Sequence, residues 1–209
     1  MSNVTHMNTA LKVNYSDTRQ HIIDTARDII LGKGFSAVGL NEILTTANVP
    51  KGSFYHYFKS KEQFGTELLE DFFDAYVLKL DAVLGDQSLP FKTRLLNFFA
   101  DWFAAQTSDV TQDKCLMVKL AAEVTDLSES MRMTLEQGSK RVTKRIKICL
   151  DGAISHKELQ SFDSEALTFE LYHMWVGATL LTKVTRSSDT LAAAMAITES
   201  RLAAISLHT

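Results

Sequence analysis

Residues that interrupt helices are scarce in this chain, and their scarcity constrains its fold more than any other feature. The 209 residues include only two prolines and nine glycines. Apolar residues recur at intervals of three and four over most of the length, which is the spacing of one face of an α-helix. A hydrophobic content of 45% is also enough for a sizeable core. The sequence therefore predicts an all-α protein of about nine helices.

The helical pattern divides the chain into three parts. Residues 1–16 are polar and aperiodic, and we expect a flexible tail. Residues 17–62 are predicted to form a small domain of short helices, and residues 63–209 are predicted to form a larger helical domain.

Charge is distributed unevenly along the chain. The formal net charge is −3, but residues 1–65 hold seven Lys or Arg against five Asp or Glu, so that part carries +2 and the rest −5. The sequence has no run of about eighteen uncharged apolar residues and no signal peptide, so we expect a cytoplasmic protein that does not interact with a membrane. Its two cysteines match no metal-ligand spacing, and we expect free thiols and neither a metal nor another cofactor.

The strongest functional pattern lies in residues 38–61, VGLNEILTTANVPKGSFYHYFKSK. A short helix is predicted from Leu40 to Ala47, and the proline of Asn48-Val49-Pro50 breaks it before the next helix begins. The second helix, Lys51 to Phe58, has no acid, and two phenylalanines four residues apart can anchor it in a core. Two short helices joined by a tight turn, the second presenting cations and hydroxyls, are typical of a DNA-binding helix-turn-helix. Residues 17–62 are therefore the predicted DNA-binding domain. The alternative for the N-terminal tail is then an arm that touches a DNA minor groove, although Lys12 and Arg19 are its only cations before the first helix is under way.

This stretch resembles the TetR family of transcriptional regulators. The pattern K-G-x-x-Y-x-Y-F-x-x-K-E is carried here by Lys51, Gly52, Tyr55, Tyr57, Phe58, Lys61 and Glu62. The resemblance covers about residues 17–70 and implies a homodimer that binds a palindromic operator in double-stranded DNA. It also implies a set of contacts to bases or backbone, made by Asn41, Lys51, Gly52, Ser53, Tyr55, His56, Tyr57 and Lys61. Many relatives have a threonine pair where Gly39 and Leu40 stand here, so neither residue is assigned a DNA contact.

Three stretches are similar to a branch of this family that senses reactive electrophiles and oxidants and includes the repressor of N-ethylmaleimide reductase. They are FYHYFKSKEQFG from Phe54, CLMVKLAAEVTDLSESMR from Cys115 and GATLLTKVTRS from Gly177. The similarity implies a repressor that releases its operator when an electrophile or oxidant modifies the helical domain. Residues 63–209 are accordingly predicted to serve regulation and dimerisation.

Cys115 is the predicted sensor. It is expected at the start of a helix, between Lys114 and Lys119, and both a helix N-terminus and nearby lysines lower the pKa of a thiol. A small buried hydrophobe is the alternative interpretation. The similarity extends to Lys183, which we expect to stabilise the thiolate, although the sequence alone does not bring the two together. Oxidation or addition of an electrophile would add bulk and polarity inside a packed domain.

A non-covalent inducer is the alternative to a reactive one. The helix predicted from Pro90 to about Thr107 is dense in aromatic residues, which is typical of a core but also of a pocket wall. A flat apolar molecule is then expected to bind among six residues of this and later helices: Phe99, Trp102, Phe103, Met117, Tyr172 and Trp175.

Several helix ends are predicted from local signals. Ser60 and Gln63 match a capping box at the start of the fourth helix. Gly32 and Gly34 are predicted to end a first helix that begins near Asp17. A seventh helix is predicted to begin at Ser128 and to end with Leu150, before Asp151-Gly152, with Cys149 on its buried stripe.

The last two predicted helices, Ser164 to Arg186 and Ser188 to about Leu207, are apolar on more than one face. Gly177 and Ala178 permit a close approach between helices. We therefore expect a homodimer through these two helices, arranged as a four-helix bundle.

An enzyme that uses Cys115 with His156 or His173 is the remaining alternative. The sequence supplies no recognisable oxyanion stabiliser or third catalytic residue. A regulator is therefore favoured over an enzyme.

Overall fold

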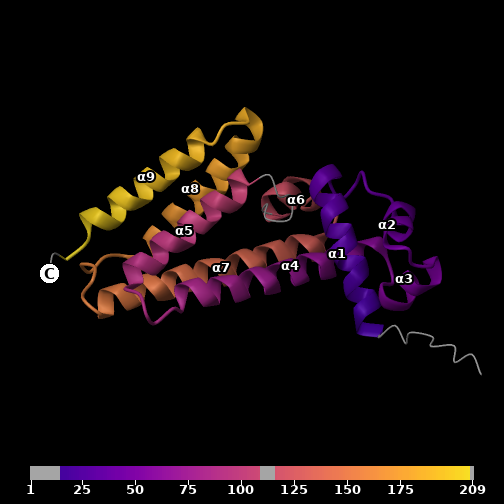
Figure 1. Ribbon diagram of the computed structural model, residues 1–209, viewed down its shortest axis with the longest axis horizontal. Helices are drawn as coiled ribbons and strands as arrows, with labels where there is room; N and C mark the ends of the chain where they lie inside the picture. The colour runs from indigo at the N-terminus through magenta and orange to yellow at the C-terminus, as the bar shows by residue number, and fades with distance from the viewer. Residues whose placement is uncertain (1–14, 109–115, 208–209) are drawn as a thin grey trace, which may run out of the picture.

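The computed structural model describes residues 15–108 and 116–207, and nine helices account for most of them (Figure 1). None of the helices in these ranges is both long and apolar enough to span a membrane. The helices are α1 (Tyr15–Lys33), α2 (Leu40–Ala47), α3 (Lys51–Tyr57), α4 (Lys61–Leu84), α5 (Phe91–Thr107), α6 (Leu116–Val124), α7 (Glu129–Ser155), α8 (Ser164–Thr185) and α9 (Asp189–Ala204).

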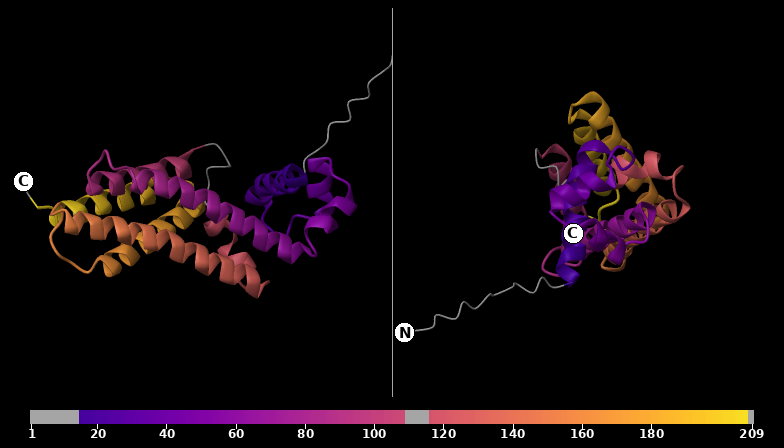
Figure 2. Two further views of the ribbon diagram at one scale, coloured as in Figure 1. Left: turned by 90° about the horizontal axis from the view of Figure 1, so that it is seen from below. Right: turned by 90° about the vertical axis from the view of Figure 1, so that its right-hand side faces the viewer.

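The three N-terminal helices form a head at one end of an elongated molecule, and α4–α9 form its body (Figures 1 and 2). α4 begins beside the head and runs along the body in the same direction as α7. Thr66 in α4 hydrogen-bonds Ser130 in α7 over 3.0 Å, and further along Asp81 in α4 pairs with Arg145 at 2.7 Å. A Cβ atom on Gly138 of α7 would lie 2.3 Å from the Phe73 ring, so this glycine permits the close packing of the two helices.

α1 is longer than predicted and continues past Gly32 to Lys33. Gly34 ends it with a φ of +92°, and its N–H bonds to the carbonyl of Ile30 over 2.8 Å. A glycine favours this left-handed conformation at a helix end because it has no Cβ. Gly32 therefore does not end the helix, and Gly34 alone ends it.

The N-terminal cap of α4 is confirmed at Ser60. Its hydroxyl accepts a hydrogen bond from the Gln63 N–H over 3.0 Å. In return, the Gln63 side chain accepts the N–H of Lys59 over 3.0 Å, one residue before the cap. The start of α4 is thereby fixed directly after the DNA-binding motif.

α7 continues through Asp151-Gly152 to Ser155, so the predicted end at Leu150 is wrong. Gly152 is needed for packing rather than for termination, because a Cβ atom there would lie 2.3 Å from the Phe91 ring of α5. The prediction that Cys149 is a core residue is confirmed, since it is 2% exposed. Glu158, beyond α7, accepts the N–H groups of Phe91 and Lys92 at 3.0 Å each and so caps the N-terminus of α5.

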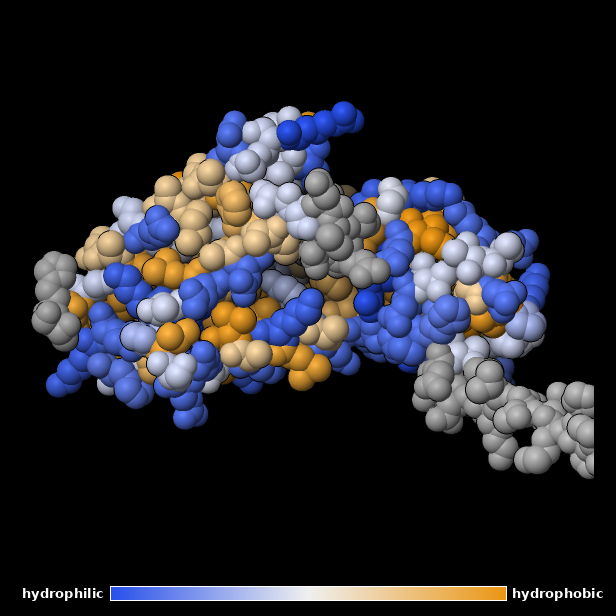
Figure 3. Space-filling model, in the orientation of Figure 1, coloured by the Kyte–Doolittle hydropathy of each residue, from blue (hydrophilic) through white to orange (hydrophobic). Residues whose placement is uncertain are grey.

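α8 and α9 run antiparallel along one edge of the body (Figure 1). Trp175 of α8 is fully buried and donates its indole N–H to Thr198 of α9 over 3.0 Å. α9 ends at Ala204 rather than near Leu207. Apolar colour lies over much of the body, including part of this edge, whereas hydrophilic colour predominates over the head (Figure 3).

Candidate DNA-binding head and regulatory body

The turn between α2 and α3 follows from its sequence. Asn48 adopts φ +53° at the end of α2, and the next N–H, that of Val49, bonds back to Leu44 over 3.0 Å. Asparagine tolerates this left-handed conformation better than most residues, and Pro50 then starts α3 without needing an N–H of its own. The predicted helix-turn-helix is confirmed.

A cluster of three aromatic rings in tilted and edge-to-face contact holds α3 in the head. Phe54 and Phe58 are fully buried, with ring centroids 5.0 Å apart, and Phe64 of α4 lies 5.5 Å and 5.0 Å from them. Rings at these separations add about 0.5–1.5 kcal/mol per pair beyond the burial itself. α3 has only seven residues and would be unstable alone, so this cluster determines which of its faces is exposed.

The outer face of α3 carries the residue types expected to contact DNA. Lys51, Gly52 and His56 are exposed, and Tyr55 is 53% exposed, while Ser53 and Tyr57 are half-buried. Asn41 is exposed on α2. Within the described residues Lys51 has no ion-pair partner, and a Cβ atom on Gly52 would meet nothing within 4 Å. The helix start is thus open to the close approach of another molecule.

Lys61 lies differently from the other predicted contacts. It is half-buried, and its Nζ donates to the backbone oxygen of Phe35 over 2.8 Å and lies 4.6 Å from the Phe35 ring centroid. Burial lowers the pKa of Lys61, and the nearby Glu123 carboxylate opposes part of this shift. An ammonium group has three donors, so two are left for a phosphate beside the bond to Phe35.

Ion pairs between α1 and α4 join the head to the body. Arg19 pairs with Glu67, and Arg27 pairs with Asp71, which also accepts a 3.0 Å hydrogen bond from Gln20. These pairs were not predicted from the sequence. Glu67 and Asp71 are four residues apart and share one face of α4, and Arg19 and Arg27 are eight apart on α1, so the spacing was a usable signal.

Cys149 lies within the part of the chain that the structure describes, and Cys115 does not. Cys115 lies outside the described residues, directly before the start of α6, and the predicted sensor therefore has no structural description. Lys183 is exposed in the last turn of α8. Burial raises the pKa of the Cys149 thiol to about 12, so this thiol stays protonated at neutral pH and is a poor nucleophile.

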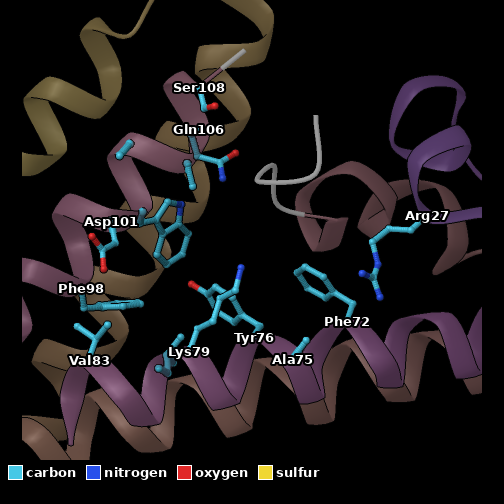
Figure 4. Close-up of a pocket in the computed structure, with 14 residues that line it drawn as sticks. Arg27, Phe72, Ala75, Tyr76, Lys79, Val83, Phe98, Asp101, Gln106 and Ser108 are labelled. Atoms are coloured by element: carbon cyan, nitrogen blue, oxygen red, sulfur yellow. The ribbon is translucent and has the colours of Figure 1, made fainter. Parts of the chain in front are cut away.

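A cavity of about 550 Å³ lies between α4 and α5 (Figure 4). Phe72 and Tyr76 of α4 line it as a stacked pair with an interplanar angle of 8°, and Trp102 and Phe98 face them from α5. The head contributes one polar wall residue, Arg27. The volume lies within the usual range of small-molecule sites, about 300–1,000 Å³.

Trp102 is the one member of the predicted pocket set that lines this cavity. The other five pack in the core of the body. Phe99 stacks on Trp175 with centroids 5.0 Å apart, and the Tyr172 hydroxyl donates to the Met117 sulfur over 3.3 Å. Phe103 is half-buried against the same cluster. The sequence predicted the aromatic core of the body, but it did not show which aromatic residues pack in the core and which line the cavity beside it.

Both ends of the chain match known sequence families. Residues 22–68 match the family described as bacterial regulatory proteins, tetR family, and residues 92–198 match the tetracyclin repressor-like C-terminal domain. The chain belongs to the TetR family. It is therefore a DNA-binding regulator and not an enzyme, and the alternative that paired Cys115 with a histidine is set aside.

Relatives from this family cover most of the chain. It is 39% identical to the HTH-type transcriptional repressor NemR of Escherichia coli K12 over 182 residues, which are 86% of this chain and 91% of the relative. The HTH-type repressor DhaR of Mycobacterium sp. strain GP1 is 30% identical over 83% of this chain and 86% of its own. The crystal structure of reduced E. coli NemR superposes with a TM-score of 0.83 at 37% identity, covering 88% of this chain and 96% of that one.

Proposed function

We propose that the protein is a homodimeric transcriptional repressor that binds a palindromic operator through α3 and releases it when its body is modified. The observation that supports this most is the composition of α3, whose outer face is polar and cationic while two buried phenylalanines fix its orientation. In a helix-turn-helix the second helix enters the major groove. Lys51, Ser53, Tyr55 and His56 would contact bases or backbone from this face, with Asn41 and Gly52 beside them.

Dimerisation follows from the size of one recognition helix, because a seven-residue helix contacts too few base pairs for specific binding. The outer stripe of α8 supports the α8–α9 edge as the interface. Phe169, Leu180 and Val184 are exposed there, and so is Ile197 on α9. A Cβ atom on Gly177, in the same stripe, would meet nothing within 4 Å, so the space over this glycine is open to a partner helix.

Cys115 is the proposed receiving group for an electrophile or oxidant, with Lys183 as the cation that stabilises its thiolate. The similarity to the NemR repressor supports this assignment. A modified side chain directly before Leu116 would add bulk at the start of a helix whose first two residues are buried. Operator affinity would then fall by the free energy that separates the two conformations of the body.

N-ethylmaleimide is a suitable probe for this sensor. A DNA duplex selected by the untreated protein from a random-sequence pool should be released after treatment, and intact mass should increase by one adduct. Cys115→Ser should bind the duplex equally and keep it after treatment, while Cys149→Ala should respond as the wild type does. Equal release from Cys115→Ser and wild type would remove Cys115 from the mechanism.

A second candidate is a non-covalent inducer, favoured by the cavity between α4 and α5. Its stacked Phe72–Tyr76 pair and the Trp102 indole suit a flat aromatic molecule. A ligand of this kind would move α4, which carries the head. Release of the duplex that is reversed by dialysis and indifferent to reductant would support this candidate over the covalent one.

A further inference from the structure

A side chain of α6 attaches the loop between α1 and α2 to the body. The carboxylate of Glu123, in α6, accepts hydrogen bonds from two consecutive backbone N–H groups, those of Phe35 (3.0 Å) and Ser36. Hydrogen bonds to an ionised acceptor are shorter and stronger than those between neutral groups. Burial raises the pKa of Glu123, but the bonds from Ser36 and Phe35, together with the charge of Lys119, outweigh it and the net shift is downward.

The loop is shaped to receive this carboxylate. Gly34 has a φ of +92°, and a Cβ atom there would lie 2.9 Å from an oxygen of Glu123. Any other residue would therefore strain the backbone and also crowd the carboxylate. On the other side of the loop, Lys61 of α4 donates to the carbonyl of Phe35 over 2.8 Å. The N–H and C=O groups of Phe35 are thus held by two different helices of the body.

We propose that Glu123 is a positioning residue that sets the angle of the head relative to the body, and hence the separation of the two recognition helices in the dimer. The proposal rests on the operator-binding function proposed above. The contact bypasses α4, because it joins α6 directly to the loop that follows α1. α6 begins one residue after Cys115. A displacement at the start of α6 would therefore also move Glu123, and with it the loop of the head that Glu123 binds.

Half-site spacing tests this role. Glu123→Gln keeps the size of the side chain, but one acceptor oxygen becomes an NH₂ donor, so at least one of the two bonds is lost. The probes are the duplex selected by the wild type and two derivatives with the half-sites one base pair closer or farther apart. Discrimination is the ratio of the affinity for the selected duplex to the affinity for each derivative. We expect this ratio to fall by about fivefold or more in the variant, which is the lower end of typical coupling between sites.

Loss of folded protein would lower the affinity for all three duplexes in proportion and leave the discrimination unchanged. Glu136→Gln is the matched control, because among the described residues Glu136 makes only surface ion pairs on α7, with Arg132 and Lys140. Amide hydrogen exchange at Phe35 and Ser36 should accelerate in Glu123→Gln and not in the control. If Glu123→Gln does not fold, Glu123→Asp keeps the charge but shortens the reach, and the same loss of discrimination is expected.

Wild-type discrimination in a folded Glu123 variant, or unchanged exchange at both amides, would overturn the positioning role. Failure of the wild type to select any duplex would instead refute the proposed operator-binding function. The two failures are therefore distinguishable.

Discussion

The outer face of α3 and the outer edge of α8–α9 are both exposed, but they expose opposite chemistry. α3 presents lysine, serine, histidine and tyrosine side chains, whereas α8 and α9 present phenylalanine, leucine, valine and isoleucine. Each is fixed from behind by a buried aromatic residue, Phe54 under α3 and Trp175 under α8. An exposed apolar stripe is stable in water only when something covers it, while a polar cationic face is stable both in water and against phosphates. The difference fits the proposed roles, in which the body edge meets a second subunit and the outer face of α3 meets DNA.

The largest effect is expected from placing a charged side chain on the apolar face of α8. Leu180→Glu places a carboxylate in the apolar stripe of α8, and two-fold symmetry places it there twice. Burying each unpaired charge costs about 2 kcal/mol or more, and the dimer buries two, so self-association should weaken by about a thousandfold or more. Analytical ultracentrifugation should detect monomers, and operator binding should be lost with the dimer.

Leu78→Glu is the control for this substitution. Leu78 is 71% exposed on α4, away from the α8–α9 edge, so the same chemical change there should leave the dimer intact. A Leu180→Glu protein that remains dimeric and binds the duplex as the wild type does would place the interface elsewhere.

The comparison also shows which parts of the fold were predictable from sequence. The helix-turn-helix was predicted within one residue at each end because Asn48, Pro50 and the two phenylalanines act locally. The end of α7 was not predicted, because the role of Gly152 depends on Phe91, sixty-one positions away in sequence. In a sequence, a glycine that permits close packing of two helices cannot be distinguished from one that ends a helix. The α8–α9 dimer interface stays a prediction, based on the excess of apolar residues in the sequence of these two helices.

A smaller effect, confined to the polar face, is expected from Lys51→Ala. Lys51 has no ion-pair partner within the described residues, so its removal should leave folding unchanged. Loss of a base contact costs about 1–3 kcal/mol, and loss of one cation lowers the slope of log affinity against log salt by about one. Fluorescence anisotropy over a salt series, with the selected duplex and a mismatched one, measures both quantities.

Lys144→Ala removes an exposed lysine from α7 and should change neither the slope nor the preference. If both lysine variants behaved alike, the contribution of α3 would be no more than general charge.

The contacts between head and body were the least predictable part of the candidate site. Glu123 lies in a helix that the sequence describes as apolar with ordinary surface charges, and its partners are backbone N–H groups rather than a lysine or arginine. A carboxylate that binds backbone leaves no charge pattern to detect. Lys61 was predicted as a phosphate contact from its motif, and its bond to Phe35 became visible only when the loop after α1 was placed beside it.

The smallest effect is expected from Tyr57→Phe. This substitution tests DNA binding by α3 without changing the dimer. Tyr57 packs its ring against His56, with centroids 5.0 Å apart, and within the described residues its hydroxyl makes no hydrogen bond. Removing the hydroxyl should therefore leave the melting temperature and the dimer unchanged. If the hydroxyl donates to a phosphate, affinity should fall by about 0.5–1.5 kcal/mol, roughly two- to tenfold, equally for matched and mismatched duplexes. Unchanged affinity for both duplexes would show that Tyr57 supports α3 through its ring alone, and a loss for only the matched duplex would show that it contacts a base.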